Sequence, residues 1–168
     1  MKKIILLFLI ILLTSSITAL AQEEVPVLRA GVSIIESVPR QFFGTWSVQS
    51  VQISTDSPKT FAKTSSDLWN LRRSGNVIEL RNPVTAAVAE IYLEDVNDNE
   101  ITFTHYEKEG YTKIKDTVKL KLDGDTFIGT NELIMRTERY NENGKKYVDV
   151  KSAIYSLRGS KLSGSGIF

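Results

Sequence analysis

Residues 100–122 read EITFTHYEKEGYTKIKDTVKLKL, two alternating runs on either side of a glycine. In the second run Ile114, Val118 and Leu120 fall on one side. The positions on the other side include four lysines: Lys113, Lys115, Lys119 and Lys121. A two-residue period is typical of a β-strand with one face toward a core. The stretch therefore predicts an antiparallel hairpin with an apolar inner face and a lysine-rich outer face.

Two polar side chains, His105 and Asp116, fall on the apolar face of this hairpin. With like faces aligned, we expect Phe103 opposite Asp116 and Ile114 opposite His105, which makes the two polar groups diagonal neighbours. Two interpretations fit this pattern. In the first, the two groups have no ligand: they form a buried pair that satisfies its own hydrogen bonds, or the predicted register is shifted. Alternatively, they are the polar contacts that orient a ligand in the interior.

Small residues on the preceding strand favour an interior with free space. In the expected strand 86–95, Ala87 and Ala89 share the inner face. Trp69, in the expected strand 67–73, either faces the core or stacks on a sugar. Together these positions form the candidate ligand-binding set: His105, Asp116, Phe103, Ala87, Ala89 and Trp69.

The rest of the chain continues the same pattern of short strands and turns. Turn signals such as Asp123-Gly124 and Asn143-Gly144 separate runs rich in β-branched and aromatic residues. Gly129 is expected to mark a bulge. The fold class predicted is all-β, an antiparallel up-and-down meander of about eight strands in a closed or nearly closed barrel; a two-sheet sandwich is the alternative. The expected strands are 44–54, 67–73, 77–82, 86–95, 100–107, 112–122, 126–140 and 146–158.

The first 21 residues have the order of a secretory signal: Lys2 and Lys3, an apolar run, and small residues before position 22. The apolar run is about half the length of a spanning helix. We expect cleavage after Ala21, no transmembrane segment in the product, and no lipid anchor because the chain has no cysteine. The expected location is periplasmic or extracellular. Residues 22–40 are then an irregular lead-in to a single β-barrel domain over 41–168, whose glycine-rich tail, 159–168, is either frayed or a ninth strand.

The start of the first strand carries one family motif. Gly44-x-Trp46, just after an irregular segment, resembles the first motif of the lipocalin and wider calycin group of β-barrels. The resemblance implies that the glycine turns the chain into the barrel and that the tryptophan closes its base. It also implies that Arg158, near the end of the last strand, lies across the indole ring. From the residues alone, Gly44 and Trp46 are equally explained as a strand-initiating glycine and a core aromatic.

Composition excludes several classes of function. The chain has no cysteine and one histidine, which excludes thiol catalysis, disulfides and a multi-histidine metal site. Without Lys2 and Lys3, 19 basic residues face 20 acidic ones, a balance that argues against nucleic-acid binding. No nucleophile elbow, phosphate loop or calcium loop is present in the sequence. We expect no enzymatic activity, no metal and no cofactor.

Two hypotheses for function remain from this reading. The first is an exported barrel that binds a small, largely apolar molecule in its interior. The alternative is a non-enzymatic interaction or structural module of the cell envelope, with a filled barrel and an outer lysine face that meets a protein or an anionic surface. An interior void of several hundred Å³ that reaches solvent would favour the first hypothesis.

Overall fold

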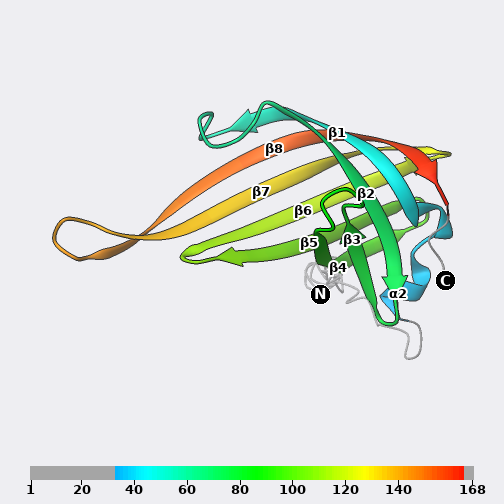
Figure 1. Ribbon diagram of the computed structural model, residues 1–168, viewed down its shortest axis with the longest axis horizontal. Helices are drawn as coiled ribbons and strands as arrows, with labels where there is room; N and C mark the ends of the chain where they lie inside the picture. The colour runs from blue at the N-terminus through cyan, green and yellow to red at the C-terminus, as the bar shows by residue number, and fades with distance from the viewer. Residues whose placement is uncertain (1–32, 165–168) are drawn as a thin grey trace, which may run out of the picture. The chain divides into compact units, whose positions relative to one another are not determined.

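The computed structural model describes residues 33–164, in which eight antiparallel strands form one closed barrel (Figure 1). Each strand pairs with the next in the chain, and β1 pairs with β8 to close the ring, which is not evenly round. The predicted fold class is confirmed, and the sandwich alternative is wrong. The strands are β1 (Gly44–Thr55), β2 (Thr64–Ser74), β3 (Val77–Arg81), β4 (Val88–Asn97), β5 (Glu100–Glu109), β6 (Thr112–Asp123), β7 (Thr126–Tyr140) and β8 (Lys146–Ser163).

The segment before the barrel contains two short helical pieces. Helix α2 (Ile34–Ser37) is a single turn, and the 3₁₀ helix η1 (Arg40–Phe42) leads directly into β1. The predicted leader, 1–21, and most of the lead-in lie outside the described residues. At the other end, 159–163 continue β8 and form no ninth strand.

The register of the β5–β6 hairpin differs from the prediction by two residues. His105 lies directly opposite Asp116, and Phe103 lies opposite Val118. The cause is the turn: β5 runs on to Glu109, and Gly110 with a φ of 54° allows a two-residue connection to β6. The predicted inner faces of both strands are unaffected, because a shift of two residues keeps each side chain on its face.

The last two strands keep one register throughout. β7 pairs without interruption with both neighbours, so the expected bulge at Gly129 is wrong. A side chain at Gly129 would lie 2.2 Å from the backbone oxygen of Lys119, which explains why glycine is needed there. On β8, Ala153 and Leu157 face the interior while Ile154 faces outward, as the burial pattern shows.

The core fills the end of the barrel where β1 begins. The indole of Trp46 is 1% exposed, and its Nε1 donates a hydrogen bond to the carbonyl oxygen of Phe42 at 2.9 Å. Phe127 packs against that indole, with ring centroids 5.1 Å apart. Buried aliphatic residues from the other strands complete this base, among them Leu71, Ile78, Ile101 and Leu120. We call this end the base and the opposite end the mouth.

Candidate functional site

A cavity of about 310 Å³ lies at the mouth of the barrel, between β2, the 82–87 loop, β4 and β5. Strand register places the inward-facing side chains from all four walls around it. The base is filled, so this cavity lies in the part of the interior nearer the mouth. Its inward-facing lining residues are Asp67, Trp69, Leu80, Ala89, His105 and Glu107.

The cavity exists because β3 is short. β3 pairs with β2 only as far as the rung of Asn70 and Arg81, so the first half of β2 has no neighbour on that side. The 82–87 loop crosses the opening, and Asn82 holds it: its Oδ1 accepts from the backbone N–H groups of Val84 and Thr85. The Nδ2 of Asn82 donates to Asp67 Oδ1 across the opening. Ala89, with its small side chain, leaves the remaining volume unfilled.

Three polar side chains meet on adjacent strands at the inner wall. His105 on β5 and Asp116 on β6 are half-buried, with 3.6 Å between Nδ1 and Oδ2. Asn131 on β7 donates from Nδ2 to Asp116 Oδ1 at 3.4 Å, and its own Oδ1 is buried with no hydrogen-bond partner among the described residues. Burial raises the pKa of the Asp116 carboxyl, and this effect outweighs the lowering by Asn131 and His105. The group is therefore a polar site that its protein neighbours satisfy only in part.

The structure brings four of the six predicted ligand-binding residues to this one cavity: Trp69, Ala87, Ala89 and His105. Asp116 does not line it but lies next to His105. Phe103 is 1% exposed and belongs to the core below, so it does not line the cavity. Trp69 is half-buried, and its ring stacks on that of Phe127 at 6.2 Å.

Sequence reasoning missed two carboxylates of the site, Asp67 and Glu107. Glu107 is two residues from His105, and Asp67 is two residues from Trp69. Each therefore points to the same face of its strand as a predicted residue. The alternation that pointed to the first set could therefore have found them. Charged residues near strand ends usually face solvent, so the candidate set expected from the sequence omits them.

The predicted role of Arg158 at the barrel base is wrong, because Lys161 occupies that place. Lys161 lies opposite Trp46 in the β1–β8 register, with its Nζ 5.1 Å from the ring centroid. The same Nζ donates to the carbonyl oxygen of Gln41 at 2.7 Å. β8 is five residues longer than the expected strand 146–158, and Arg158, opposite Gln49, points outward. Gly44, with a φ of 129°, does open the first strand at the base.

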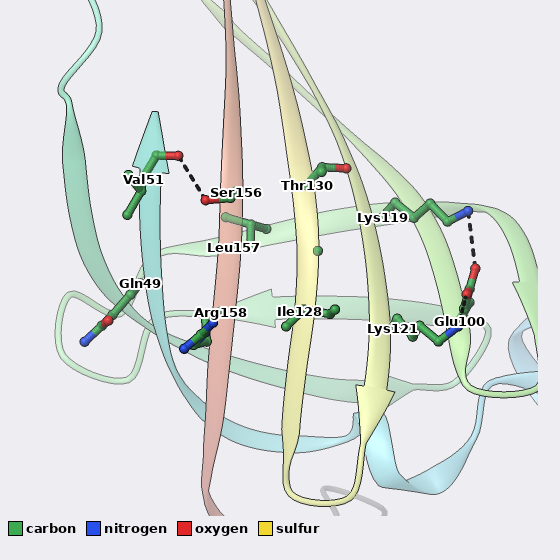
Figure 2. A pocket seen from close by; sticks show the side chains of 11 residues that line it. Gln49, Val51, Glu100, Lys119, Lys121, Ile128, Thr130, Ser156, Leu157 and Arg158 are labelled. Carbon is green, nitrogen blue, oxygen red and sulfur yellow. Dashed lines mark hydrogen bonds and ion pairs between the residues drawn. The ribbon is translucent and has the colours of Figure 1, made fainter. Parts of the chain in front are cut away.

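A second hollow, of about 650 Å³, lies on the outer surface of the barrel rather than inside it (Figure 2). It runs across β1, β8, β7 and β6 to Glu100 at the start of β5, and most of the labelled side chains project from the outer faces of these strands, whereas Leu157 faces the interior. Lys119 and Lys121 both bind Glu100, at 3.2 and 2.9 Å. We call this hollow the outer groove.

Within residues 33–164, no three acidic or histidine side chains converge in the manner of a metal site. The same part of the chain holds no helix long and apolar enough to cross a membrane. Comparisons with protein-family models, with curated proteins and with solved structures find no match for this chain.

Proposed function

We propose that this chain is a non-enzymatic binding protein that holds a small, largely apolar molecule in the cavity at the barrel mouth. One observation carries the proposal: four of the candidate ligand-binding residues expected from the sequence line a single cavity of about 310 Å³. That volume lies at the lower end of the range of small-molecule sites. A few polar groups beside apolar walls are the usual composition of such sites.

The chemistry of the cavity walls limits the kinds of ligand that fit the site. Trp69 and Leu80 offer apolar contact, while Asp67 and Glu107 offer acceptor oxygens at the rim. These carboxylates can only accept hydrogen bonds when ionised, so a ligand with donor groups, such as hydroxyls or an amine, satisfies them best. His105, at the inner wall, is placed to orient the polar end of the molecule.

The proposal also covers the cellular location of the protein and its relationship to the lipocalins. The secretory signal expected over 1–21 supports export to the periplasm or the outside of the cell. The base supports a likeness to lipocalins: Gly44 opens the strand, Trp46 closes the end, and a cation covers the ring. Lys161 would take the part of the arginine expected from that resemblance.

The alternative is an envelope interaction module with a filled barrel. It agrees with the packed side chains of the base but not with the cavity at the mouth. Trp46, Phe103 and Phe127 are each 1% exposed and pack in the base. A structural module would have no need of a solvent-reaching cavity. We therefore place the ligand-binding proposal first.

Titration with the neutral, apolar, fluorescent N-phenyl-1-naphthylamine tests the proposal. We expect the wild-type protein to bind this probe with one site per chain, with a rise in probe fluorescence. Ala89→Leu should weaken binding about tenfold or more, because the added side chain occupies the cavity. Glu90→Leu is the matched control. Glu90 is the next residue of β4 and is exposed, so this variant places the same side chain on the outer face.

Equal loss of binding in both variants would mean that the probe binds elsewhere. Thermal unfolding of each variant checks that Ala89→Leu still folds. His105→Leu gives a second test at an independent position. If it lowers only the melting temperature and leaves the probe affinity unchanged, the buried-pair interpretation of His105 and Asp116 replaces the ligand-binding one.

A further inference from the structure

The outer groove is built from two neighbouring rungs of the sheet. One rung contains Arg158 between its partners Gln49 and Ile128. The next contains Ser156 between Val51 and Thr130. On β6 the two rungs end in lysines, Lys121 opposite Ile128 and Lys119 opposite Thr130. Arg158 and Lys121 thus flank Ile128, while Val51 lies on β1, on the other side of β8.

The floor exposes large apolar side chains at the bottom of a hollow. Val51 is 52% exposed and Ile128 is 57% exposed. Between them lie the small side chains of Ser156 and Thr130, and the Ser156 hydroxyl already donates to the carbonyl oxygen of Val51. A hollow of about 650 Å³ with such a floor is large enough for a small molecule.

The charges of the groove are unbalanced. Glu100 is shared by Lys119 and Lys121, which together lower its pKa and keep it ionised. Arg158 forms no ion pair with any residue between 33 and 164. The groove therefore has three cations against one carboxylate, and its guanidinium remains available for an anion.

We propose that the outer groove binds a small amphiphilic organic anion, an alkyl chain that ends in a carboxylate. The carboxylate pairs with the guanidinium of Arg158, whose planar donors match that group in a two-pronged contact. The alkyl chain covers Ile128, which is directly opposite Arg158 at about 5 Å between Cβ atoms, and extends across Ser156 toward Val51, the diagonal neighbour of Arg158 on β1. Binding would remove both exposed apolar side chains from water.

The shape of the site favours a single molecule over an anionic membrane. The cations and the apolar floor lie within one hollow, as Figure 2 shows, with Arg158 and Lys121 on opposite sides of Ile128. A flat lipid surface would contact the rim of such a hollow before its floor. The site is also separate from the mouth cavity, since its side chains project from the opposite face of the barrel wall.

Calorimetric titration with dodecanoate below its micelle concentration tests this site. We expect one dodecanoate per chain in the wild type. Arg158→Gln should weaken binding about tenfold or more, because it removes a charge-assisted contact, and Ile128→Thr should weaken it to a smaller extent. The matched control is Lys145→Gln, which removes one positive charge from the exposed β7–β8 turn and should leave the affinity unchanged.

Three results would overturn the inference. Unchanged dodecanoate affinity in Arg158→Gln would exclude the guanidinium as its partner. Loss of dodecanoate in Ala89→Leu with no loss in Arg158→Gln would place the anion in the mouth cavity. Binding to phosphatidylglycerol vesicles without any binding of monomeric dodecanoate would make the groove a membrane contact. Binding of N-phenyl-1-naphthylamine by Arg158→Gln serves as the check that the mouth cavity is intact, so failure of the two proposals can be told apart.

Discussion

Asp116 is a carboxyl group held inside the barrel wall at a cost to the folded state. It contacts His105 and receives one long hydrogen bond from Asn131, yet burial still raises its pKa. The Oδ1 of Asn131 beside it is buried and lacks a partner among residues 33–164. We propose that this incompletely satisfied cluster serves ligand binding through His105, which lines the cavity, rather than stability of the fold.

The replacement Asp116→Asn should stabilise the free protein at neutral pH. Because the folded pKa of Asp116 lies above the unfolded value, near 3.8, this carboxyl contributes stability below that value, and the contribution is lost as the pH rises through the folded pKa. The amide does not ionise, so the variant lacks this loss. Urea unfolding at pH 7 and at pH 3.5 should show a gain at pH 7 that shrinks at pH 3.5. Asp125→Asn, in the β6–β7 turn, is the control, and an equal gain at both values would contradict the expectation.

Strands β7 and β8 are the longest elements and extend beyond their neighbours as a two-stranded hairpin (Figure 1). β1 accompanies β8 only as far as the pair of Thr55 and Ala153. Just beyond, Asp56 caps the ladder: its carboxylate accepts from the backbone N–H and the hydroxyl of Ser152, both at 2.8 Å. Beyond the pair of Thr55 and Ala153, β8 keeps β7 as its strand neighbour and becomes an edge strand, so the cap lies where stability begins to fall.

Removal of this cap should loosen the hairpin without unfolding the barrel. In Asp56→Ala we expect the backbone amides of 147–152 to exchange with deuterium several-fold faster, while those of 154–160, inside the barrel wall, keep their protection. Hydrogen exchange followed by mass spectrometry or NMR measures the difference. Glu142→Ala, in the turn at the tip of the same hairpin, should change neither group. Uniform acceleration along β8 would show that the hairpin and barrel open as one unit.

At the scale of the whole barrel, closure depends on the last residues of β8. Trp46 pairs with Lys161 and Ser47 with Ser160, so the end of β8 covers the base of β1. A side chain at Gly44 would lie 2.0 Å from the backbone oxygen of Gly164, which shows how closely the two ends approach. Closure also removes the free edges that β1 and β8 would otherwise expose.

A chain that ends after Gly159 should lose this closure. It lacks Lys161 and the three pairs that join β8 to the start of β1. We expect a lower urea midpoint and a red-shifted tryptophan emission, measured in a Trp69→Phe background so that Trp46 alone reports. A chain that ends after Gly164 keeps every one of these pairs and is the control. The same midpoint in both chains would show that the base is held by its side-chain core alone.

The strand positions could be predicted from the sequence because alternation and turn residues are local signals. Alternation placed Ile101, His105 and Asp116 on the correct face. It could not find the register of the hairpin, since a shift of two residues leaves every side chain on the same face. The two-residue turn at Gly110 decides between the two registers. The predicted strand ends at 107 and so implies a longer turn.

The sequence predicts which side chains of the candidate site point inward, but not how far along the barrel each one lies. Parity indicates that Phe103 and His105 both point inward, yet one is sealed in the core and the other lines the cavity. Their height along the barrel depends on where neighbouring strands end, above all on the short β3. In the same way, the choice between Arg158 and Lys161 as partner of Trp46 depended on how far β8 continues.

The sequence by itself determined that this chain forms an antiparallel all-β meander and which side chains face its centre, because both properties arise from a two-residue period within single strands. Only the tertiary structure decided where the interior is filled, where it is hollow, and which cations stand beside Trp46 and Ile128. Those arrangements join residues from strands far apart in the chain, and they depend on strand lengths and registers that no local pattern encodes.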